Sequence, residues 1–139
     1  MIKTILLSLL LLLSSSAFAN TIYCILDKTS DDSHLADTAA FEVDLTNKTI
    51  TIKPNYGVES LYGEVTSSRG SLYGYRLNAI VSMSNSVDGN KRHKEISIFA
   101  PEADVTKALI SEAVFEEIEG TDYLLNSAKH EYSCRIINN

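Results

Sequence analysis

The segment Ala40–Lys53, "AFEVDLTNKTITIK", carries the clearest indication of fold class in this chain. Apolar side chains occupy every second position before Asn47-Lys48, and again after it. These positions are Phe41, Val43, Leu45, Ile50 and Ile52. A period of two is typical of strands with one buried and one solvated face. Because Asn tolerates positive φ, we predict a β-hairpin that turns at Asn47-Lys48.

The same alternation recurs toward both ends of the chain. Further runs of this kind are Thr21–Leu26, Leu72–Met83, His93–Ala100 and His130–Ile137. Short strands at regular spacing, with few helices, are typical of antiparallel β-sandwiches and up-and-down barrels. We therefore predict an all-β fold of about eight strands, a small β-barrel or β-sandwich, and the pattern leaves these two alternatives open.

One segment, Pro101–Gly120 or "PEADVTKALISEAVFEEIEG", fits two structures. Proline and acidic residues at its start and glycine at its end favour a helix. However, its apolar residues do not form a single helical stripe, and every second residue from Leu109 to Phe115 shares one strand face. We predict a strand over Ala108–Glu117, preceded by a turn or a short helical start, and we keep a helix as the alternative.

Residues 1–19, "MIKTILLSLLLLLSSSAFA", have the features of a secretory signal peptide. Lys3 precedes the apolar run Ile5–Leu13, and small residues end the segment in an Ala-x-Ala pattern. The apolar run is shorter than the about 20 residues that a membrane-spanning helix needs. Tyr23 directly before Cys24 argues against a lipoprotein cleavage site. We therefore expect an exported protein, secreted or periplasmic, with a single domain over residues 20–139.

The charge of the expected mature chain argues against two classes of partner. Removal of residues 1–19 leaves 139 − 19 = 120 residues, a size that suits one domain with a real core. Without Lys3 the chain has 11 basic and 18 acidic residues, so its net charge is 11 − 18 = −7. Such a chain repels nucleic acids and anionic membrane surfaces. We expect neither a nucleic-acid partner nor a membrane anchor, and the sequence leaves the oligomeric state open.

The two cysteines, Cys24 and Cys134, lie near the two ends of the mature chain. An even number of cysteines in an exported protein indicates a disulfide. This bridge would join the first strand to the last, and loop-closure entropy predicts a stabilisation of about 4.7 kcal/mol. A cysteine nucleophile or a metal pair is the alternative, but there is no Cys-x-x-Cys spacing and no nearby histidine.

The tetrapeptide Ser-Leu-Tyr-Gly occurs twice, beginning at Ser60 and at Ser71. With the turn of a hairpin at Ser67–Gly70, Tyr62 would face Tyr75, and the two repeated glycines, Gly63 and Gly74, would face each other. The repeat would then be explained by aromatic and glycine pairs across two strands.

This predicted hairpin supplies the candidate binding site. Tyrosines beside glycines would form a flat aromatic surface for a partner, and a loop arginine could bind a carboxylate. The candidate binding residues are Tyr62, Arg69, Tyr73 and Tyr75. Half-buried strand tyrosines without a binding role are the structural alternative.

The chain contains no recognisable catalytic or metal-binding motif. His34, His93 and His130 have no metal-ligand spacing, and the acidic loop around Asp32 lacks the pattern of an EF-hand. The basic run Lys91–Lys94 could meet an acidic partner, or it could simply be a solvated hairpin end. No serine lies in a Gly-x-Ser-x-Gly motif. We therefore expect no cofactor, no metal and no catalysis.

Three functions are compatible with these features. We expect a small exported binding protein, a protein-interaction or inhibitor module that contacts another exported protein. The first alternative is a carrier that holds a small apolar ligand in a barrel lumen. The second alternative is an enzyme without a recognisable motif. A fold by itself does not choose among them.

Overall fold

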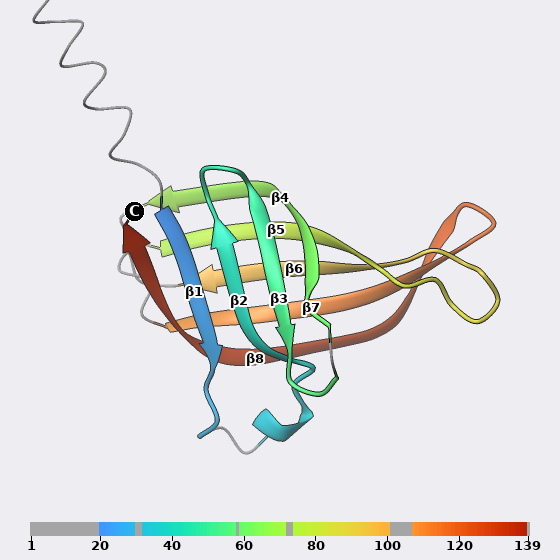
Figure 1. Ribbon diagram of the computed structural model, residues 1–139, viewed down its shortest axis with the longest axis horizontal. Helices are drawn as coiled ribbons and strands as arrows, with labels where there is room; N and C mark the ends of the chain where they lie inside the picture. The colour runs from blue at the N-terminus through green and yellow to red at the C-terminus, as the bar shows by residue number, and fades with distance from the viewer. Residues whose placement is uncertain (1–19, 30–31, 58, 72–73, 101–106, 139) are drawn as a thin grey trace, which may run out of the picture.

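The computed structural model of the protein describes residues 20–29, 32–57, 59–71, 74–100 and 107–138. Eight antiparallel strands follow one another in sequence order and close into a barrel, because β8 pairs with β1 (Figure 1). The strands are β1 (Asn20–Leu26), β2 (Thr38–Asp44), β3 (Thr49–Pro54), β4 (Leu61–Ser71), β5 (Gly74–Met83), β6 (Arg92–Ala100), β7 (Lys107–Ile118) and β8 (Thr121–Asn138). The all-β prediction is confirmed, and the barrel rather than the sandwich is the correct alternative. The predicted signal peptide lies outside the described residues.

The ambiguous segment forms a strand, as predicted for Ala108–Glu117. Strand β7 is hydrogen-bonded to β6 on one side and to β8 on the other, so its backbone groups have partners without a helix. The glycine that resembled a helix end, Gly120, lies in the two-residue turn between β7 and β8. Glu119 and Gly120 have φ values of 52° and 78°, as a type I′ hairpin turn requires. The predicted turn or helical start falls largely on residues 101–106, which lie outside the described residues.

The barrel interior is filled by side chains from alternate positions of the strands. Phe41 and Tyr132 are the largest fully buried aromatic residues, and their rings meet edge to face with centroids 5.1 Å apart. Eight strands enclose a space about wide enough for side chains to fill. Aliphatic residues complete this core, among them Ile22, Ile50, Ile52, Leu77, Ile96, Ile98 and Ile110.

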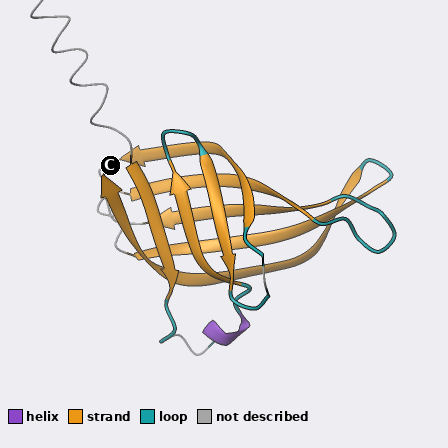
Figure 2. Cartoon of the chain, in the orientation of Figure 1, coloured by secondary structure: helices purple, strands orange, loops and turns teal. Residues whose placement is uncertain are grey.

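The described part of the connection between β1 and β2 contains a short 3-10 helix, η1 (Ser33–Leu35), followed by residues 36–37 (Figure 2). Ala36 is fully buried in the core. The side-chain amide of Asn55 donates a hydrogen bond to the carbonyl of Ala36, and the Tyr56 hydroxyl donates to the carbonyl of His34. These two bonds tie the connection to the loop that follows β3.

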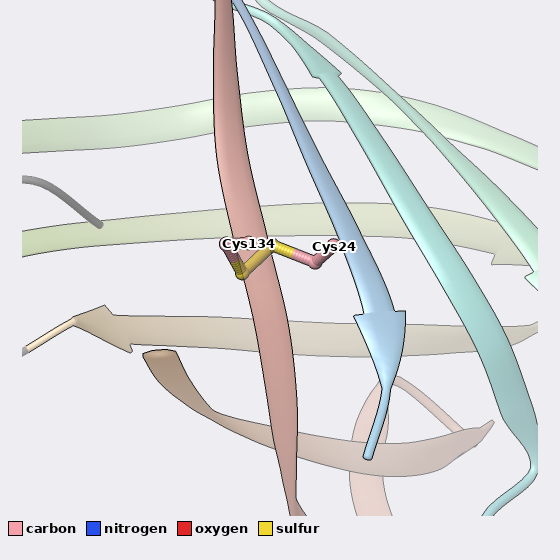
Figure 3. Close-up of a disulfide and its surroundings, with 2 residues drawn as sticks. All are labelled: Cys24 and Cys134. Atoms are coloured by element: carbon pink, nitrogen blue, oxygen red, sulfur yellow. A yellow bond between two sulfur atoms is a disulfide. The ribbon is translucent and has the colours of Figure 1, made fainter. Parts of the chain in front are cut away.

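The predicted disulfide between Cys24 and Cys134 is confirmed (Figure 3). The two residues are direct partners in the β1–β8 ladder, and their Cα atoms are 4.1 Å apart. Both side chains point into the core. The bridge therefore closes the barrel where the first and last strands meet.

The hairpin predicted from the repeated tetrapeptide has the wrong register. Strand β4 continues through Ser67–Gly70, where we placed the turn, and its partner strand β5 begins at Gly74. Consequently Tyr62 pairs with Thr51 of β3, and Gly63 pairs with Val81 rather than with Gly74.

Close packing explains both glycines on β4. A Cβ atom on Gly63 would lie 2.3 Å from the carbonyl oxygen of Ile80, so glycine allows β4 to approach β5 there. Gly70 pairs with Tyr75, whose ring lies against it; a Cβ atom on Gly70 would be 3.3 Å from that ring. Tyr75 therefore lies opposite Gly70, and not opposite Tyr62 as the predicted register required.

The hairpin predicted over Ala40–Lys53 is confirmed, with β2 and β3 paired in the expected order. Positive φ falls on Lys48, at 55°, and not on the preceding asparagine. Asp44 holds this turn, because its carboxylate accepts hydrogen bonds from the backbone and side-chain amides of Asn47. These bonds lower the pKa of Asp44 below its usual value.

Candidate binding surface

The structure does not gather the four predicted binding residues into one site. Tyr62 is 71% exposed at the start of β4, and Arg69 lies seven positions further along the same strand, which corresponds to about 23 Å. Tyr75 is half-buried, and this burial raises the pKa of its hydroxyl. Tyr73 lies outside the described residues. The arrangement separates Tyr62 from Arg69 and Tyr75, while their binding role stays a prediction.

A different part of the molecule exposes apolar side chains together. The β5–β6 and β7–β8 hairpins extend beyond the barrel, at the right of Figure 1. Within a few residues of the β7–β8 turn, four large apolar side chains are exposed. They are Ile118 (38%), Tyr123 (52%), Leu124 (57%) and Leu125 (48%). We call these four residues the apolar tip.

A β-bulge shapes the apolar tip. Val114 pairs with Asn126 and Phe115 pairs with Leu124, so Leu125 is the extra residue of β8. A bulge increases local twist and bends the strand that carries it. The bulge also explains why three apolar residues follow one another at 123–125, in a strand that otherwise alternates. This break in the alternation was the sequence signal that could have located the tip.

An open pocket of about 630 Å³ lies next to the tip, on the outer face of β5–β8. Small side chains form much of its lining: Ser97, Ser111, Ala113 and Ser127. Their neighbours along the strands, such as Ile96 and Glu112, are buried in the interior, so the pocket lies outside the barrel. Glu95 and Lys129 add one charge of each sign.

Aromatic residues lie at both ends of this pocket along β6. At one end His93 stacks on Phe115, with ring centroids 5.2 Å apart and an angle of 13° between the planes. At the other end the Arg76 guanidinium lies over the Phe99 ring, 5.3 Å from its centroid. His93 and Phe99 are six positions apart along β6, which corresponds to about 20 Å. Each ring thus already has a face covered by a neighbouring side chain.

Charged groups also lie inside the barrel. Lys94 and Glu112 form an ion pair at 3.1 Å, and each side chain is only 6% exposed. The Thr38 hydroxyl donates a 2.6 Å hydrogen bond to the same carboxylate. Tyr132 donates its hydroxyl to the Thr38 carbonyl, and burial, followed by the nearby Glu112 charge, raises the pKa of Tyr132. His130 is buried beside this cluster, and its Nδ1 lies 3.8 Å from a carboxylate oxygen of Asp32.

This internal cluster has the chemistry of a structural network. Additional hydrogen bonds help to offset the cost of burying two charges. Here the Thr38 hydroxyl and the Lys94 ammonium both donate to Oε1 of Glu112. The small exposure of Lys94 and Glu112 leaves a substrate little access to either group. Across the described ranges, no group of three or more His, Cys, Asp or Glu side chains could hold a metal ion.

Comparisons with family models, with curated proteins and with solved structures find no match for this chain. Among the residues described, no helix has the length and apolar character needed to cross a membrane.

Proposed function

We propose that this protein is a small exported binding module without catalytic activity, and that the apolar tip is its main contact with a partner protein. The single observation that carries this proposal is the exposure of four large apolar side chains on one projecting hairpin. By the register of the ladder, Leu124 lies on the same face as Phe115, whereas Ile118 and Tyr123 lie on the opposite face, so the tip exposes apolar side chains on both faces of the hairpin. Exposed apolar surface commonly marks an interaction site. Tyrosine and leucine at a convex tip can be buried in a cleft of another protein.

The neighbouring pocket supports a contact larger than the tip. Leu124 pairs with Phe115, which stacks on His93 at the end of the pocket, so tip and pocket are continuous on the outer face. A partner that buries the tip could also cover the small side chains of the pocket. Stacking of a sugar ring is less well supported, because His93 and Arg76 already cover faces of Phe115 and Phe99.

The two alternative functions have less support from the same geometry. A carrier needs free space in the lumen, whereas Phe41, Tyr132 and the disulfide occupy the centre of the interior. An enzyme needs accessible polar groups, whereas Lys94 and Glu112 are nearly inaccessible. An exported location is part of the proposal. The disulfide is consistent with an oxidising compartment.

A capture experiment from the exported fraction of the native host tests the proposal. The baits are the wild-type oxidised protein, the tip variant Leu124→Thr/Leu125→Thr, and a matched control, Ile25→Thr/Ile137→Thr. The control residues are 48% and 37% exposed on the barrel wall, so both variants remove exposed apolar surface. Threonine keeps the β-propensity of each strand.

We expect a partner that the wild type and the control retain and the tip variant loses. A fourth bait, Arg69→Ala/Tyr75→Ala, tests the site predicted from the sequence. Loss of the partner in this fourth bait, with full capture by the tip variant, would place the contact on β4–β5 and would contradict a binding role for the apolar tip.

A further inference from the structure

We infer that the apolar tip binds an apolar surface bordered by lysine or arginine side chains, so that its partner is locally cationic. This inference rests on the proposed function and specifies the chemistry of the partner. Residues 116–122 have the sequence "EEIEGTD", which contains four acids and no base. The turn that presents the apolar side chains is therefore also the site of a concentrated negative charge.

Three of these four acids form no ion pair in the described part of the molecule, although the backbone of Lys91 lies beside Glu117, whose amide donates a hydrogen bond to the Lys91 carbonyl. Glu116 is neutralised by Arg92, whose Nε lies 3.1 Å from the carboxylate. Glu117, Glu119 and Asp122 are exposed and take part in none of the ion pairs found there. We call these three residues the acidic collar: Glu117 and Asp122 flank the turn as a cross-strand pair, and Glu119 lies in the turn itself.

The register of the hairpin makes this collar unfavourable in the free protein. Glu117 and Asp122 are direct cross-strand partners. Like charges at opposed positions destabilise a β-ladder. A cationic side chain placed between the two carboxylates would remove this repulsion, and this would make binding of a cationic partner more favourable. An anionic membrane or a nucleic acid would increase the same repulsion.

The apolar residues and the collar together specify the partner. Phe115 and Leu124 share one face of the hairpin with the Glu117–Asp122 pair, because cross-strand pairs two positions apart point the same way. A contact that buries Leu124 therefore brings the two carboxylates against the border of the partner's apolar surface. Cationic groups at that border would speed association and fix orientation.

Two defined peptides serve as probes. One is an amphipathic leucine–lysine peptide, and the other is its leucine–glutamate counterpart with the same leucine positions. Binding to the full oxidised protein is measured by fluorescence anisotropy at low and at high salt, and the contact is mapped by amide NMR. The charge variant is Glu117→Lys/Glu119→Lys/Asp122→Lys. The matched control, Glu42→Lys/Glu59→Lys/Glu64→Lys, makes the same change in net charge at three exposed acids of other segments.

We expect the lysine peptide to bind the wild type at least tenfold more tightly than the glutamate peptide, with shifts centred on residues 115–126. The charge variant should reverse this preference, and the control should retain it. Equal binding of both peptides, or the same reversal in the control, would overturn the inference.

The tip variant Leu124→Thr/Leu125→Thr separates this inference from the proposed function. If that variant loses affinity for both peptides while the charge variant changes nothing, the tip is a contact but the cationic partner is wrong. If the tip variant binds as tightly as the wild type, and the shifts lie elsewhere, the proposed role of the tip fails and the inference fails with it.

Discussion

The two halves of strand β7 follow one pattern with different consequences. In its first half, the side chains of Ala108, Ile110 and Glu112 point into the barrel interior and are buried. Beyond Val114 the strand continues in the projecting hairpin, and there Ile118 is 38% exposed. The alternation therefore fills the core in the barrel body, and in the projecting hairpin it leaves an apolar side chain exposed to solvent. If this comparison is correct, substitutions in the body should change stability, and substitutions in the tip should change binding.

The largest effect is expected from the buried ion pair in the barrel body. Lys94→Met should lower the free energy of unfolding by about 3–5 kcal/mol, because it leaves the Glu112 charge buried without its partner. The double variant Lys94→Met/Glu112→Met removes both charges and should recover most of this loss. The free energy of unfolding of both variants is measured by chemical denaturation. A double variant as unstable as the single one would show that the pair does not act as a unit.

The disulfide should have the next largest effect. Cys24→Ser/Cys134→Ser opens the β1–β8 closure, and we expect a loss of about 2–5 kcal/mol in the free energy of unfolding. Thermal unfolding of the oxidised and the reduced wild type provides an independent comparison. Affinity of the folded variant for its partner should be unchanged, since the bridge lies in the core. A loss of affinity in a variant that remains folded would show that the disulfide affects binding at the apolar tip.

Gly63 tests close packing within the body. Gly63→Ala places a Cβ atom 2.3 Å from the backbone of β5, and we expect about 1–3 kcal/mol of destabilisation from this overpacking. Gly70→Ala is the matched control on the same strand, because its Cβ would meet only the Tyr75 ring, at 3.3 Å. The two free energies of unfolding should therefore differ. Equal values would mean that β4 and β5 separate at no cost.

A smaller effect is expected at the β2–β3 turn, a second hairpin end that is held by Asp44. Hydrogen bonds from Asn47 lower the pKa of Asp44 in the folded state. The stabilisation of the folded state by the ionised Asp44 is therefore fully present above the unfolded-state pKa of about 3.9. It is lost as the pH falls through the lower pKa of the folded state. Asp44→Asn should reduce the fall in melting temperature between pH 5 and pH 3. An unchanged pH profile would exclude this carboxylate as a contributor.

The smallest effect on stability is expected at the apolar tip. Leu124→Thr and Leu125→Thr should each change the free energy of unfolding by no more than about 1 kcal/mol, because about half of each residue is already exposed to solvent. Hydrogen exchange should also be faster for amides at 115–126 than for amides at 107–112. A decrease in the free energy of unfolding as large as that of a core substitution would show that the tip packs against the barrel body.

The strand content and the disulfide can both be predicted from residue order alone. Period-two alternation around Asn47-Lys48 specifies a hairpin, because a strand places successive side chains on opposite faces. Two cysteines at the ends of an all-β chain left one pairing. The four residues chosen as a binding site were a weaker prediction, because neither exposure nor strand register is encoded by residue type alone.

The closure of the barrel, the register of its strands and the location of the exposed surface depend on packing in three dimensions. Closure depends on β8 pairing with both β7 and β1, which is a contact between distant parts of the chain. The register of β4 depends on how closely Gly63 lets two strands approach. The exposure of Leu124 depends on whether another element covers it. Each of these properties is set by packing between segments far apart in sequence, and local alternation is the same whichever packing is adopted.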